Sequence, residues 1–322
     1  MFNRRTILFT SLVAAGVALA PMVKAAEQPK KVVASFSILG DIVKNIGGDR
    51  IELTTLVGPN GDAHVYQPTP KDARSVSDAD LVVVNGLGFE GWLNRLVEAA
   101  EYQGPIAVAT AGLTALKSTE EHDEAAASDD GQKEKHASDR EDAHHGDLDP
   151  HAWQSIANAR VYVRNVLKAL TEMDPHGAAV YDSNAKSFLA ELDTVDTGIR
   201  NAVASLPAER RKVVTSHDAF GYFAHEYGIR FLAPVGMSTE SEASAGDVAA
   251  LIRQIKEEQI PAVFVENIAD GRLLDQIARE TGAIIGGTLF SDALSGPDGP
   301  AGTYVKMMRH NSRTLAAALS TS

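Results

Sequence analysis

Four side chains that could bind a metal ion follow apolar, strand-like segments of this 322-residue sequence. His64 lies in VGPNGDAHVYQPTP, after IELTTLV, and His217 comes directly after KVVTS. His151 lies in LDPHAW, and Asp292 lies in TLFSDALS after the apolar run AIIGG. Ligands of open α/β folds bind outside the carboxyl ends of strands, so these are the places where a site would form. Taken singly, each residue could equally be a solvated histidine or a helix cap.

The four candidates fall two in each half of the chain, as a site between two domains requires. The Gly-Pro-Asn-Gly turn before His64 and two prolines after it restrict the backbone, which lowers the entropy cost of holding a ligand. Asp149 and Pro150 are typical of an N-cap and a first helical position, which places His151 at a helix start. We expect His217 to open a helix over DAFGYFAHEYG.

Other titratable residues are weaker candidates. Glu266, near the end of PAVFVEN, is either a further ligand or an acceptor that orients a histidine, and we favour the second. His225 and Glu226 begin HEYGI, which lacks the second histidine of the metalloprotease motif H-E-x-x-H. The sequence therefore gives no sign of a zinc protease.

An acidic segment from 117 to 149 interrupts the regular pattern. It holds His122, His136, His144 and His145 among many carboxylates and almost no large apolar residue, so it cannot bury enough surface to order itself. We expect a mobile loop that collects metal weakly, because ligands that must be ordered on binding give lower affinity. The alternative is a solvated insertion without a role.

The elements that must position the candidates alternate between short β-branched runs and amphipathic helices, twice along the chain. This order is typical of βαβ units on parallel sheets. Between the two sets, apolar residues recur every three to four positions from Ala178 to Leu206, which predicts one long helix. We therefore predict an α/β protein of two lobes, 27–175 and 207–322, each with a parallel sheet flanked by helices and joined by a rigid linker helix over 176–206.

The first 26 residues have the pattern of a secretory signal peptide: Arg4 and Arg5, a short apolar stretch, and small residues near a cleavage site at 25 or 26. The arginine pair leaves both general secretion and twin-arginine export open. With no cysteine in the chain, we expect neither disulfides nor a lipid anchor, and thus a free periplasmic protein. The formal charge of -13 repels phosphates and suits cations, so we expect no nucleic-acid partner.

The segments GPNGDAHVYQPTP, DPHAW, SHDAFGYFAHEYG and LFSDALS, in this order and with a long helix between the halves, resemble the zinc and manganese solute-binding proteins of ABC importers, the cluster A-I group. The resemblance runs from about Lys31 to the C-terminus. It implies that His64, His151, His217 and Asp292 are the metal ligands. It also implies a two-lobed carrier, not an enzyme, that delivers its ion to a permease in the inner membrane.

Three imidazoles and one carboxylate suit tetrahedral Zn²⁺, whereas Mn²⁺ prefers oxygen-rich sites. In this family, manganese binders commonly carry a carboxylate where this chain has His217. We therefore expect a monomeric zinc carrier, which a periplasmic zinc chaperone could load, with manganese or mixed binding as the alternative. A zinc hydrolase and an adhesin are weaker alternatives, because Asp292 would fill the position that a catalytic zinc leaves open for water.

Overall fold

The computed structural model describes residues 28–117 and 148–320. The strands and helices of the first half are β1 (Lys30–Phe36), α1 (Ser37–Gly47), β2 (Ile51–Val57), α2 (Pro70–Ser77), β3 (Leu81–Val84), α3 (Leu93–Ala99), β4 (Ile106–Val108) and α4 (Ile156–Met173). The long helix α5 (Ala178–Ala204) follows. The second half holds β5 (Lys212–Val214), α6 (Gly221–Tyr227), β6 (Arg230–Leu232), α7 (Ala245–Glu257), β7 (Ala262–Glu266), α8 (Arg272–Thr281), β8 (Ile284–Leu289) and α9 (Tyr304–Ser320).

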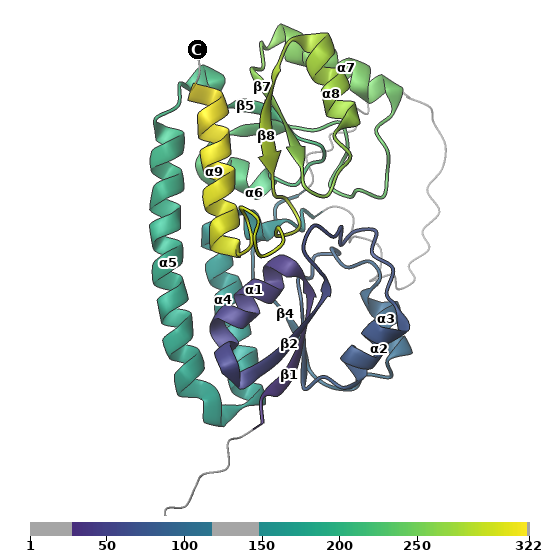
Figure 1. Ribbon diagram of the computed structural model, residues 1–322, viewed down its shortest axis with the longest axis vertical. Helices are drawn as coiled ribbons and strands as arrows, with labels where there is room; N and C mark the ends of the chain where they lie inside the picture. The colour runs from purple at the N-terminus through teal and green to yellow at the C-terminus, as the bar shows by residue number, and fades with distance from the viewer. Residues whose placement is uncertain (1–27, 118–147, 321–322) are drawn as a thin grey trace, which may run out of the picture.

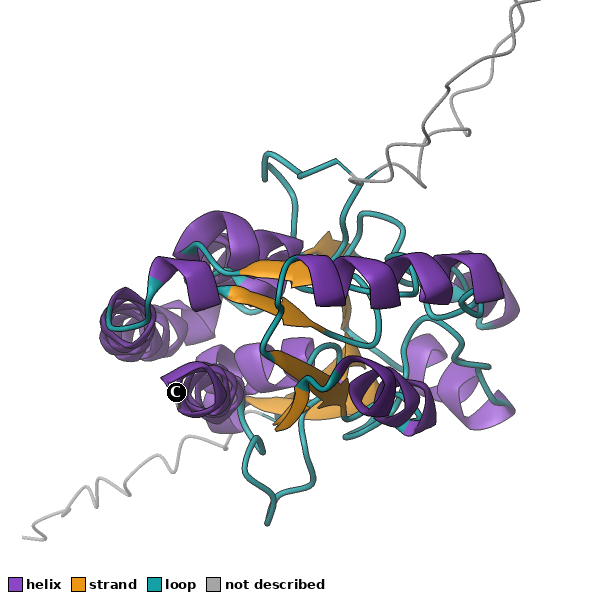
Figure 2. Ribbon diagram, turned by 90° about the horizontal axis from the view of Figure 1, so that it is seen from above, coloured by secondary structure: helices purple, strands orange, loops and turns teal. Residues whose placement is uncertain are grey.

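Two four-stranded parallel sheets form the framework, in the orders β2-β1-β3-β4 and β6-β5-β7-β8. Helices lie on both sides of the strands (Figure 2). In each sheet the first strand lies between the second and the third, so the chain reverses its direction of progress there. Such a switch point leaves a crevice at the carboxyl ends of the strands. The predicted fold class is confirmed. The switch point lies at the same place in both sheets.

Helix α5 runs alongside both lobes (Figure 1). Its 27 residues span about 40 Å. The predicted linker helix is confirmed, with its start at Ala178, after the 3₁₀ turn Pro175–Gly177, and its end at Ala204. Its buried positions, which include Phe188, Leu192 and Val195, recur with helical spacing. The predicted domain limits at 175 and 207 stay predictions.

A single apolar core joins the lobes. It contains residues of β1 and α1 from the first half, the inner face of α5, and Phe223, Phe264 and Met307 from the second half. A smaller, separate cluster lies between α7, α8 and the sheet of the second half, around Leu251 and Ile277. Because interiors pack as densely as crystals, a core shared by both lobes resists a large change in their relative orientation.

Some predictions fall on residues that are not described. They are the leader, residues 1–26, and the loop histidines His122, His136, His144 and His145. The two ends of the acidic segment are described, and Lys117 pairs with Leu148 in an antiparallel bridge. Among the described helices, none is long and apolar enough to cross a membrane.

Asp41 links α1 to the first turn of α9, where its carboxylate accepts a hydrogen bond from the backbone N–H of Tyr304 (2.9 Å). Burial, opposed by this hydrogen bond and reinforced by Glu191, raises the pKa of Asp41 from 3.8 to about 6. A carboxyl group whose pKa is higher in the folded than in the unfolded protein makes the fold less stable as pH rises between these two values.

We expect Asp41→Asn, whose amide oxygen can still accept from Tyr304, to remove this pH dependence. The free energy of unfolding of the variant, relative to the unchanged protein, should rise by about 1–2 kcal/mol between pH 4 and pH 7. Urea unfolding of both metal-free proteins across this range measures it. A difference that stays constant with pH would show that Asp41 is not the titrating group.

Candidate metal centre

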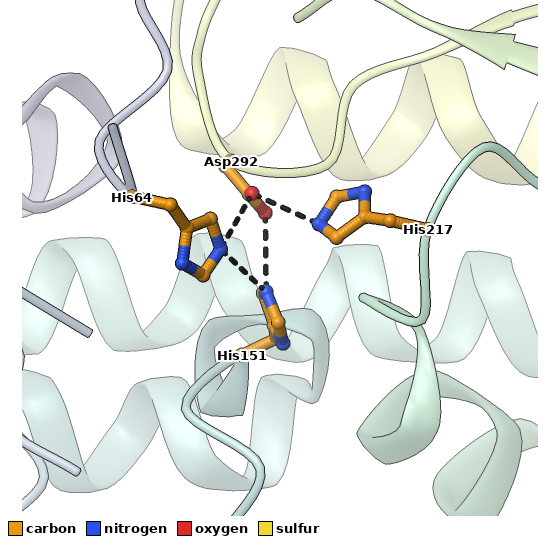
Figure 3. A group of neighbouring side chains, drawn as sticks. All are labelled: His64, His151, His217 and Asp292. Atoms are coloured by element: carbon orange, nitrogen blue, oxygen red, sulfur yellow. Dashed lines mark hydrogen bonds and ion pairs between the residues drawn. The ribbon is translucent and has the colours of Figure 1, made fainter. Parts of the chain in front are cut away.

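His64, His151, His217 and Asp292 converge between the lobes (Figure 3). One potential ligand atom from each lies within 4.8 Å of the others. All four side chains are buried, with exposed fractions between 0% and 7%. Two come from each half, as the sequence predicts, and among the described residues this is the single group of its kind. Burying several ionisable groups together is costly unless they are paired, so a cluster of this composition suits a cation as its partner.

His64 lies in the loop between β2 and α2. Its backbone N–H donates to Oδ1 of Asp62 (2.9 Å), and the indole N–H of Trp92 donates to the carbonyl of Ala63 (2.7 Å). The second oxygen of Asp62 accepts from the hydroxyl of Thr239, in the other lobe (2.7 Å). Asp62 therefore ties the His64 loop to the opposite lobe, a role that the sequence analysis missed. The one signal in the sequence is a carboxylate two residues before a candidate ligand.

His151 is held by Asp149, for which the sequence pattern predicts a helix N-cap. This interpretation was wrong: Oδ1 of Asp149 accepts from the backbone N–H of His151 (2.9 Å) and lies 2.8 Å from its Nδ1. The residues that follow form a 3₁₀ turn, and Ser155 is the N-cap of α4. Because a carboxylate can only accept, Nδ1 carries the proton and Nε2 is left to bind a metal.

His217 lies just beyond β5, and the helix expected to start with it begins at Gly221 instead. The prediction that His217 opens a helix was therefore wrong. Oε2 of Glu266, at the end of β7, lies 2.6 Å from Nδ1 of His217. The other oxygen of Glu266 accepts from the backbone N–H groups of Ser216 (2.7 Å) and His217 (2.9 Å). Glu266 lies outside the four-residue group, in the position of an acceptor that orients His217.

Asp292 turns both carboxylate oxygens toward the histidines. Oδ2 lies 3.1 Å from Nε2 of His217 and 3.3 Å from Nε2 of His64, and Oδ1 lies 3.6 Å from Nε2 of His151. Within the described part of the chain, Oδ1 is buried without a hydrogen-bond partner. A buried acceptor of this kind costs free energy unless a cation or donor meets it. Three Nε2 atoms and this carboxylate therefore form a donor set that fits a divalent transition metal.

The charges of the cluster are strongly coupled. Burial disfavours the charged form of His217, but Glu266 and Asp292 outweigh it and raise the pKa of His217 well above its ordinary value. Burial acts in the opposite sense on Asp292, yet the neighbouring His217 and His151 hold the pKa of Asp292 well below its ordinary value. In the metal-free protein, a proton on His217 therefore offsets part of the negative charge of Glu266 and Asp292. Metal binding at neutral pH releases this proton.

His64 also borders a cavity of about 380 Å³ between the lobes, which Leu87, Met237 and Glu240 help to line. His151 and Asp292 are not among its lining residues, and both are fully buried. Of the four side chains, His64 is also the most exposed, at 7%. An ion that reaches the centre through this cavity meets His64 first.

Two parallel-sheet lobes, a long helix alongside them, and a buried cluster of three histidines and one aspartate between them define a metal-binding protein of the solute-binding class. Residues 32–318 match the family model described as ZnuA, "Zinc-uptake complex component A periplasmic". The chain belongs to this family, the cluster A-I metal-binding solute-binding proteins of ABC importers.

Relatives and solved structures agree with this assignment. The chain is 35% identical to "Iron-binding protein YfeA" of Yersinia pestis over 89% of its own length and 85% of the relative's. It is 31% identical to "Manganese ABC transporter substrate-binding lipoprotein PsaA" of Streptococcus pneumoniae over 91% and 90% of the two chains. The periplasmic zinc-binding protein TroA of Treponema pallidum superimposes with a TM-score of 0.78 at 30% identity, over 91% of this chain and all of that one (100%).

These names bear on two predictions. The relatives are named for iron or manganese and the structural neighbour for zinc, so the class is shown and the metal is left open. Several relatives are named lipoproteins, so the expectation that this protein has no lipid anchor stays a prediction. The family places the protein outside the cytoplasm and implies a membrane permease as its partner.

Proposed function

We propose that this protein captures one Zn²⁺ ion at His64, His151, His217 and Asp292 and delivers it to the permease of an ABC importer. The observation that carries the proposal is the donor set, in which three imidazole Nε2 atoms face one carboxylate in a buried, closed cluster. Imidazole-rich sites suit zinc, whose bonds to histidine nitrogen are about 2.0–2.1 Å long. The ion is cargo, and Asp292 closes the position that a hydrolytic zinc site leaves to water, so we propose no enzymatic activity.

Manganese is the second candidate, and one observation favours it. Both oxygens of Asp292 point into the cluster, so the carboxylate can bind with two atoms. Together with the three imidazole nitrogens, it would give five donors. A site with more donors and more oxygen atoms suits Mn²⁺ better than a four-coordinate tetrahedral site. Against it, Mn²⁺ lies at the weak end of the divalent affinity order, so an imidazole-rich site favours zinc when both are present.

The acidic segment is proposed to lie outside the primary site. Because Lys117 and Leu148 already pair in an antiparallel bridge, a two-residue turn in place of residues 118–147 can join them without moving the lobes. We expect the shortened protein and the full-length mature protein each to bind one tight zinc per chain, with additional weak binding in the longer form alone. Calorimetric titration with zinc and with manganese, together with metal analysis, measures this.

Two results of this titration would overturn the proposal. Loss of the tight site on removal of 118–147 would place a primary ligand in that segment. Equal affinity for manganese and zinc would contradict the choice of metal. We further propose that the mature protein is a monomer, which light scattering of the same samples checks, and that a periplasmic chaperone can load it.

A further inference from the structure

The backbone carbonyl of Ser291 receives two side-chain hydrogen bonds from the opposite lobe. The indole N–H of Trp153 and the amide Nε2 of Gln154 both donate to it, each at 2.8 Å. All three residues are fully buried. The carbonyl belongs to the peptide unit that leads into Asp292, and the two donors follow His151 by two and three residues. One carbonyl thus joins the backbone of a ligand from the first lobe to that of a ligand from the second.

Both sides of this contact are held by further buried hydrogen bonds. The hydroxyl of Tyr304 donates to the carbonyl of Trp153 (2.6 Å). On the other side, the side-chain amide of Asn311 accepts from the backbone N–H of Phe290 (2.9 Å) and donates to the backbone carbonyl of Phe290 (2.8 Å). Neither the turn after His151 nor the loop before Asp292 can therefore shift without breaking buried hydrogen bonds, each worth about 1 kcal/mol.

Gln154 is an unfavourable choice for folding alone. Its Oε1 is buried and has no hydrogen-bond partner among the described residues, and a buried acceptor of this kind costs about 1–3 kcal/mol. Exchanging its amide atoms would set Oε1 against the Ser291 carbonyl, where two acceptors repel, so the donor must face Ser291. An apolar side chain of similar size would fill the same space without this cost. The contribution of the amide is its N–H donor, which fixes the position of the Ser291 carbonyl next to Asp292.

We propose that Trp153 and Gln154 are positioning residues that set the separation of His151 and Asp292 and thereby favour zinc over the larger manganese ion. The inference rests on the proposed metal-carrier function and adds residues to it that contact no metal themselves. A larger ion has to push the two ligands apart, and the shared carbonyl resists this movement. Outer contacts that orient metal ligands are worth about 10–100-fold in affinity when removed.

The test is Gln154→Met, which keeps the length and apolar volume of the side chain and removes the donor. The Ser291 carbonyl still accepts from Trp153, so no new buried group is left unpaired. The matched control is Asn165→Leu, because the amide of Asn165 likewise donates to backbone carbonyls, those of Ala109 and Ala111 (2.8 and 2.9 Å), within one lobe and outside the four-residue cluster. Zinc and manganese affinities come from competition titrations, and the visible spectrum of the Co²⁺-loaded protein reports ligand geometry.

In Gln154→Met we expect zinc affinity about 10-fold lower, manganese affinity changed less, and a shifted Co²⁺ spectrum. The metal-free variant should unfold at the same or a higher temperature, because an unpaired Oε1 is lost. Asn165→Leu should keep the affinities and the spectrum. Unchanged affinities and spectrum in Gln154→Met, or an equal loss for both metals, would overturn the inference.

A second variant, Trp153→Phe, keeps a buried ring and removes the other donor, and it should shift the preference in the same direction even if Gln154→Met is poorly folded. Zinc binding by the wild-type protein distinguishes failure of the proposed function from failure of the positioning role. If it binds no zinc, the proposed function fails. If it binds zinc and both variants behave like it, the function stands and the positioning role fails.

Discussion

Replacing His151 by alanine should lower zinc affinity by more than about 100-fold, because outer contacts of metal-bound histidines alone are worth about 10–100-fold. His151 is fully buried, its Nδ1 faces Asp149, and its Nε2 faces Asp292. Removal of the ring therefore deletes one of four donors and leaves the Asp149 carboxylate buried without its imidazole. Zinc titration in competition with a chelator of known affinity gives the loss.

His225→Ala is the matched control, since His225 lies exposed on α6, away from the centre. It should bind zinc as the unchanged protein does. The stability of the metal-free protein separates a lost ligand from a lost fold. We expect His151→Ala to remain folded, with a thermal midpoint that zinc raises far less than in the unchanged protein. A folded variant that keeps its zinc affinity would remove His151 from the ligand set.

The second large effect is expected for Glu266→Gln. The amide oxygen can still accept from the backbone N–H groups of Ser216 and His217, but the negative charge beside Nδ1 of His217 is lost. Zinc affinity at pH 8 should fall about 10–100-fold, because the imidazole loses its orienting acceptor and part of its basicity.

The pH dependence gives this prediction a readout that a structural defect would not produce. Burial lowers the pKa of His217, and the opposing charges of Glu266 and Asp292 raise it well above the ordinary value. Zinc must displace the resulting proton near neutral pH, so affinity in the unchanged protein rises with pH. In Glu266→Gln the pKa of His217 falls and fewer protons are released. Calorimetry in buffers of different ionisation enthalpy counts them.

Glu258→Gln is the control for a lost carboxylate, because Glu258 pairs with Lys212 and Arg230 on the surface of the same lobe. It should leave both affinity and proton release unchanged. Equal proton release by the unchanged protein and Glu266→Gln would mean that Glu266 does not act on His217.

Much of this architecture could be predicted because its causes are local. Parallel strands read as short apolar runs, and their carboxyl ends are where His64, His217 and Asp292 stand. The regular apolar spacing from Ala178 to Leu206 predicted a helix, and the linker range 176–206 exceeds α5 by two residues at each end. Both features depend on periods of two and 3.6 residues, which neighbours along the chain determine.

What could not be predicted depends on the directions of side chains and on distant partners. Asp149 precedes a proline, a pattern shared by helix caps and by acceptors for a nearby histidine, so the sequence favoured the wrong one. The bond from Gln154 to Ser291 joins residues 137 positions apart, and no period or motif indicates it. The contact between Asp62 and Thr239, 177 positions apart, is hidden for the same reason.

Anomalous diffraction at the zinc absorption edge, from crystals of the zinc-loaded protein, would locate the ion that we propose at His64, His151, His217 and Asp292. We expect one strong peak per chain, with three histidine Nε2 atoms about 2.0–2.1 Å away and the Asp292 carboxylate at a similar distance. A principal peak elsewhere, or a peak here without one of these four side chains, would contradict it.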